Sequence, residues 1–84
     1  DFRWLNTDDG NNTVAFLRSK DSDQMLTVLC RNDQPRTIRI PAPAGWTRSS
    51  EAVFTSEGSS AKLRVEGGEL VIDMPPLTAA VFKP

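Results

Sequence analysis

Acidic side chains are the residues of this chain best suited to acid–base chemistry, because paired carboxylates can act as general acid and general base. The 84 residues include 11 aspartates and glutamates but no histidine. The lack of histidine removes the usual general base, the Ser-His-Asp triad and most zinc sites. The carboxylates fall in turns and on alternating positions of short apolar runs, where solvation explains them. We therefore expect no active site within these residues.

The segment 8–12 gathers oxygen-bearing side chains that could bind calcium. Its spacing does not match an EF-hand loop, which has ligands at alternate positions and a distal glutamate. Asp, Asn and Gly are also the residue types that form turns. We interpret the segment as a turn and predict neither a metal nor a cofactor; no CxxC pair or phosphate-binding glycine loop is present either.

Two tryptophans, Trp4 and Trp46, are candidates for carbohydrate contact. Sugars present apolar C–H faces that stack on exposed aromatic rings, whereas most large aromatic side chains of small domains pack inward. Trp46 follows a Pro/Gly-rich loop at 42–45, and we expect it to fold back over the core as a lid. Trp4 lies near the start of the chain, where we expect it to pack on a neighbouring domain.

Composition places the chain among folded single domains. It is 38% hydrophobic and 25% charged, with a formal net charge of −1 and scattered Lys and Arg, which disfavours nucleic-acid binding. No apolar run is long enough to cross a membrane.

The single cysteine, Cys30, lies in an apolar run, and we expect it to be buried. The absence of disulfides favours a cytoplasmic location. The chain starts at Asp1 without an initiator methionine, so we expect a piece of a longer polypeptide.

Short runs rich in Val, Ile, Leu, Phe and Thr recur with turn residues between them, which predicts an all-β fold. The run at 25–31 is the most apolar and is placed at the sheet centre. Gly67 and Gly68 predict a type I′ hairpin, because both central residues of that turn have positive φ. The strands are predicted at residues 2–5, 13–20, 25–31, 36–41, 50–55, 62–66, 69–74 and 77–82.

Residues 74–83, near the end of the chain, have the pattern of a turn with two prolines followed by an apolar strand. Two prolines cannot donate to a sheet ladder, so they precede the strand or lie at a sheet edge. Alternation along the strand puts Leu77, Ala79 and Val81 on one face and residues 78, 80 and 82 on the other.

Taken in order, these motifs resemble domain C, the C-terminal all-β domain of α-amylase-family glycoside hydrolases. The resemblance covers nearly the whole chain and departs from the family pattern at Cys30, where Asn is common. It is nearest to the neopullulanase, cyclomaltodextrinase and maltogenic amylase group or to the glycogen branching enzymes. The segments that carry it are residues 1–5, 8–9, 14–18, 25–33, 36–41, Trp46, 67–70 and 75–81.

The resemblance implies that residues 1–84 form one antiparallel Greek-key β-sandwich of about eight strands, packed against the catalytic TIM barrel of the same polypeptide. The family's catalytic carboxylates belong to the barrel, so no catalytic residue is carried over to this chain. The domain would stabilise the barrel, with Phe2 and Trp4 as docking candidates, and its apolar patch would drive weak self-association when isolated.

Two alternatives to this role stay open. The first is a carbohydrate-binding module that contacts α-glucan through Trp4 or Trp46. The second is an immunoglobulin- or fibronectin-like module, which the lack of paired cysteines and of tyrosine disfavours.

Overall fold

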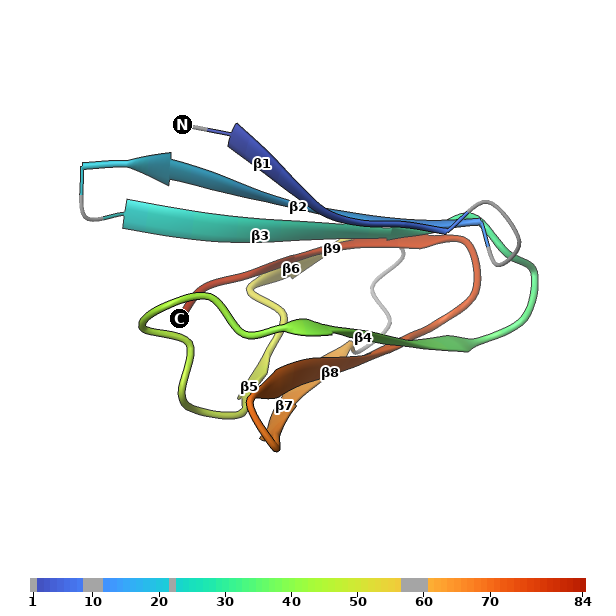
Figure 1. Cartoon of the computed structure of the whole chain (residues 1–84). Coiled ribbons are helices and arrows are strands. Elements are labelled where there is room, and N and C mark those ends of the chain that lie inside the picture. The colour runs from blue at the N-terminus through green and yellow to red at the C-terminus, as the bar shows by residue number, and fades with distance from the viewer. Residues whose placement is uncertain (1, 9–11, 22, 57–60) are drawn as a thin grey trace.

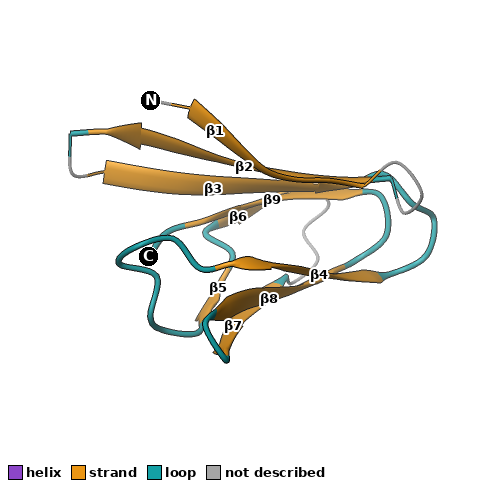
Figure 2. Cartoon of the chain, in the orientation of Figure 1, coloured by secondary structure: helices purple, strands orange, loops and turns teal. Residues whose placement is uncertain are grey.

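The computed structural model describes residues 2–8, 12–21, 23–56 and 61–84. Within these residues the chain forms nine β-strands in two stacked antiparallel sheets, joined by turns and loops (Figures 1 and 2). The all-β prediction is therefore confirmed. The strands are β1 (Phe2–Asp8), β2 (Thr13–Lys20), β3 (Asp23–Cys30), β4 (Arg36–Pro41), β5 (Ser50–Glu51), β6 (Phe54–Thr55), β7 (Lys62–Glu66), β8 (Glu69–Met74) and β9 (Thr78–Phe82).

The five-stranded sheet has the order β1-β2-β3-β9-β6, and the four-stranded sheet has the order β4-β8-β7-β5. The chain passes from the first sheet to the second between β3 and β4, visits the first sheet again for β6 alone, and returns to it between β8 and β9 (Figure 1). β3 lies at the centre of the larger sheet, as its apolar sequence predicted. The Greek-key description of these connections stays a prediction.

The core lies between the two sheets and follows from strand alternation. Inward side chains of the larger sheet, such as Leu26, Val28 and Phe82, face Ile40 and Ile72 of the smaller sheet, and all five are buried. Successive residues of a strand point to opposite faces, so each of these strands contributes every second residue to the core. Cys30 is a free thiol that is 2% exposed, and it packs as a small hydrophobe.

Two turns confirm their sequence signals. Gly67 and Gly68 have φ values of 56° and 80° and join β7 to β8 in the predicted hairpin. The two prolines at 75 and 76 precede β9, as predicted; residues Thr78, Ala80 and Phe82 share one face of that strand, and this is the buried face.

The prediction of one strand at 50–55 is wrong. Ser50–Glu51 pairs with β7 in the smaller sheet, whereas Phe54–Thr55 pairs with β9 in the larger sheet. The segment therefore crosses from one sheet to the other, leaving Val53 and Phe54 exposed. The other differences are shifts of strand ends by a few residues.

Most of the turn predicted at 8–12 lies outside the described residues; Asp8 ends β1 and Asn12 has a φ of 55°. Among the described residues no group of three or more acidic or cysteine side chains is placed to hold a metal ion. Nor does that part of the chain contain a helix long and apolar enough to cross a membrane.

Candidate docking surface

One row of side chains runs across the outer face of the five-stranded sheet, from one edge strand to the other. Each neighbouring pair in this row is a cross-strand pair in the register of the sheet. Strands lie about 4.8 Å apart, so the row spans roughly 19 Å. We call it the outer row; in order across the sheet it consists of Trp4, Phe16, Thr27, Val81 and Phe54.

The outer row faces away from the core because its neighbours along each strand face inward. Ala15 and Leu17 flank Phe16 and are buried, as are Ala80 and Phe82 on either side of Val81. Alternation then directs Phe16 and Val81 outward. No described segment covers this side of the sheet, since the four-stranded sheet lies on the other side (Figure 1).

Three aromatic rings cluster at the β1 end of the outer row. The Trp4 ring lies 5.5 Å from the Phe16 ring at 69° and 5.1 Å from the Phe2 ring at 84°, both edge-to-face. Phe2 and Phe16 stack at 5.0 Å. Trp4 is nevertheless 59% exposed, and Phe54 at the far end of the row is exposed to the same extent. The row thus ends in a large exposed aromatic side chain at each edge of the sheet.

The outer face of the four-stranded sheet has the opposite character. Arg39 lies 3.7 Å from Glu69, and Arg64 donates a 2.7 Å hydrogen bond to Asp73. Val71 pairs with both arginines across the strands and is fully buried, so their side chains cover it. The sandwich therefore has one outer face covered by ion pairs and another crossed by a row of mostly apolar side chains, which is the less suited of the two to water.

The two tryptophans differ in burial. Trp46 is 2% exposed, belongs to the core cluster, and its Nε1 donates a 2.7 Å hydrogen bond to Gln24 Oε1. The predicted lid is confirmed, and the ring face needed for sugar stacking is not accessible at Trp46. Trp4 is exposed, but it stands edge-on to its two aromatic neighbours, so the cluster offers no flat platform of coplanar rings.

A comparison with protein families matches residues 4–84 to the alpha amylase C-terminal all-beta domain. The chain belongs to this family. The membership agrees with the two-sheet architecture and with the family that the order of motifs suggested.

Curated relatives of this C-terminal all-beta domain include 1,4-alpha-glucan branching enzymes GlgB of Burkholderia pseudomallei strains 668 and K96243. Both are 38% identical over 64 residues, which is 70% of this chain and 8% of the enzyme. The chain thus spans less than a tenth of the length of these relatives. The crystal structure of an alpha-amylase from H. orenii aligns with 99% of this chain and 16% of its own, at a TM-score of 0.69 and 19% identity, which indicates a shared fold.

Sequence reasoning named Phe2 and Trp4 as docking candidates of this domain, and the structure places both on the apolar outer face. It missed Phe16 and Phe54 as parts of the same surface. The sequence of β2 indicated that Phe16 lies on a covered surface, because residues 14–17 are all apolar and therefore occupy both faces of the strand. A strand that is apolar on both faces is usually covered by other structure on both sides. Phe54 gave no such signal, since its strand has two residues.

Proposed function

We propose that residues 1–84 are a non-catalytic accessory domain of an enzyme that acts on α-glucans, and that the domain docks on the enzyme's catalytic domain through the outer row. The observation that carries the proposal is the contrast between the two outer faces of the sandwich. One is crossed by an apolar row with exposed aromatic ends, and the other is covered by ion pairs.

The catalytic domain of the same polypeptide is the occupant that family membership favours. The family is named as a C-terminal domain of alpha amylase, and the matched segment is 8% of each branching enzyme relative. The remainder of such a polypeptide is large enough to cover the outer face. Burial of apolar surface between the two domains would stabilise both of them.

Chemistry would reside in the covered domain rather than in this one. The chain contains no histidine, and its described carboxylates at Glu66, Glu69 and Asp73 are engaged with arginines on the solvent face. These contacts support a structural role for them.

The proposal is tested by replacing Trp4 in the full-length polypeptide. We expect Trp4→Ser to lower the temperature at which the catalytic domain unfolds and to separate one calorimetric transition into two. In the isolated 84-residue chain the same change removes only exposed edge-to-face contacts, worth about 1 kcal/mol.

The matched control is Lys62→Ser, which alters an exposed side chain on the opposite face of the sandwich. It should leave the calorimetric trace of the full-length polypeptide nearly unchanged. Equal destabilisation by Trp4→Ser in the isolated chain and in the full-length polypeptide would refute docking at this row.

A second candidate role, glucan stacking, rests on the exposure of Trp4 alone. Titration of the 84-residue chain with maltoheptaose, followed by tryptophan fluorescence, separates the two roles. Docking through Trp4 predicts no change on addition of sugar, whereas a saturable change that Trp4→Ser abolishes would favour a carbohydrate-binding module.

A further inference from the structure

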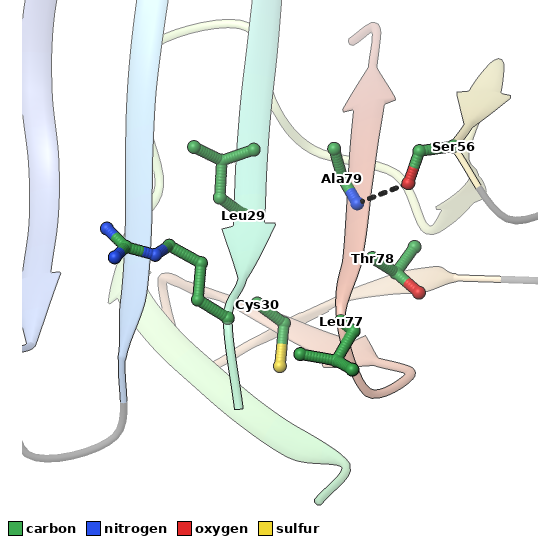
Figure 3. Close-up of a pocket in the computed structure, with 7 residues that line it drawn as sticks. Leu29, Cys30, Ser56, Leu77, Thr78 and Ala79 are labelled. Carbon is green, nitrogen blue, oxygen red and sulfur yellow. Dashed lines mark hydrogen bonds between the residues drawn. The ribbon is translucent and has the colours of Figure 1, made fainter. Parts of the chain in front are cut away.

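A hollow of about 440 Å³ opens beside the outer row, where β3, β9 and the end of β6 meet (Figure 3). Leu29 and Ala79 are a cross-strand pair at the hollow, and Ser56 Oγ accepts a 2.9 Å hydrogen bond from the Ala79 N–H. Because Ala79 carries only a methyl group, the surface is lowered between Leu29 and Ser56. The hollow thus results from a small side chain at an outward position.

Leu77 forms part of the lining in a strained conformation. Its φ is 50°, in the left-handed region that L-residues with a bulky side chain avoid, and its side chain is 59% exposed. The turn is held by the Leu77 N–H, which donates to Asn32 O, and by Thr78 Oγ1, which donates to Pro76 O. Gly or Asn would fit this backbone with less strain.

The turn after Pro76 accounts for the positive φ. It does not account for a leucine there, and an exposed leucine contributes little to the core of the domain. Strained residues of this kind cluster at binding sites, where the surrounding structure fixes them. The Leu77 side chain stands beside a hollow lined by Leu29 and Ala79, which together offer an apolar anchor and an apolar recess. A protruding apolar side chain beside an apolar recess is typical of the closely packed centre of a protein interface.

We propose that this hollow receives an apolar side chain of the catalytic domain of the same polypeptide, with Leu77 packed beside it as a second anchor of the interface. The inference rests on the proposed function and adds a specific contact to it. Leu29 and Ala79 lie two residues from Thr27 and Val81 of the outer row, on the same strands and the same face. The recess is therefore continuous with the proposed docking surface.

The lining favours an apolar occupant over a sugar. Sugar sites combine an aromatic ring with several converging polar groups. None of the described residues that line the hollow is aromatic, and its charged group is Arg31. An apolar side chain from a covering domain satisfies this lining better than a glucan does.

Two substitutions test the proposal through different physical effects. Ala79→Trp fills the hollow from an outward position, and Leu77→Asn removes the apolar anchor while it suits the left-handed backbone. In the full-length polypeptide we expect either change to raise the rate at which a protease separates the domains by about tenfold, as for one anchor residue of an interface. In the 84-residue chain, Leu77→Asn should leave the unfolding midpoint unchanged or raise it.

The control is Thr37→Asn on the opposite sheet, which should not change the protease cleavage rate. If Trp4→Ser accelerates cleavage and the two hollow variants do not, the hollow contact is refuted and the proposed function stands. If Trp4→Ser also has no effect on cleavage, both the hollow contact and the proposed function are refuted. A loss of stability with Leu77→Asn in the isolated chain would make Leu77 a structural residue and overturn its role as an anchor.

Sedimentation of the 84-residue chain checks the alternative occupant. We expect self-association, if present, to be unaffected by Ala79→Trp. Dimers that Ala79→Trp abolishes would assign the hollow to a second copy of this chain and overturn the proposal.

Discussion

The Trp46 indole N–H donates a 2.7 Å hydrogen bond to the side-chain oxygen of Gln24, although the two residues are 22 positions apart. Gln24 lies on β3 of the five-stranded sheet, and Trp46 lies in the loop that follows β4 of the four-stranded sheet. The bond therefore joins the two layers where the Trp46 ring covers the core.

Loss of this hydrogen bond should destabilise the 84-residue chain. Gln24→Ala leaves the buried indole donor unpaired, which costs about 1–3 kcal/mol. Trp46→Ala also creates a cavity and should cost about 3–5 kcal/mol. Urea unfolding measures both values. Gln34→Ala, at an exposed glutamine, serves as the control, and an equal effect of the two glutamine variants would contradict this account.

Fluorescence should distinguish the two tryptophans in the 84-residue chain. Trp46 is 2% exposed and Trp4 is 59% exposed. A Trp4→Phe variant, which retains only Trp46, should emit at shorter wavelength and resist acrylamide quenching. A Trp46→Phe variant should show the reverse. Equal quenching of the two variants would contradict the burial of Trp46.

Substitutions of Gly67 should change the stability of the β7–β8 hairpin only through the backbone conformation at that residue. Its φ is 56°, and a Cβ added there would meet no atom within 4 Å. Gly67→Ala should therefore cost about 1 kcal/mol, from the left-handed backbone. Gly67→Asn should cost less, because Asn tolerates that region. Thermal unfolding compares the two variants, and a larger loss with Asn would point to a side-chain clash.

The ion pairs of the four-stranded sheet should contribute little to stability. The side chains of Arg64 and Asp73 are 46% and 44% exposed, although their atoms lie 2.7 Å apart. Asp73→Asn should change the free energy of unfolding by less than about 1 kcal/mol, and 1 M salt should reduce the difference. Chemical denaturation at low and high salt measures it. A large loss that salt does not affect would show that the network stabilises the fold.

The sequence by itself determined the local elements of this domain. Alternation between apolar and polar residues located β4, β7 and β8 at their observed bounds, because every second residue of each strand faces the core. Positive φ at Gly67 and Gly68 was required by the turn type and not by any distant contact. The apolar stretch of β3 also indicated the centre of the larger sheet correctly.

Only the tertiary structure decided which surfaces come together. The segment at 50–55 divides between two sheets because its partners, β7 and β9, lie in different layers, and two-residue strands contain no pattern that identifies a partner. The outer row joins Trp4 to Phe54 through strands that are distant in sequence, so its members share a face only after register is fixed. Likewise, Trp46 is buried and Trp4 exposed because long-range packing, rather than residue type, decides which aromatic ring the core accepts.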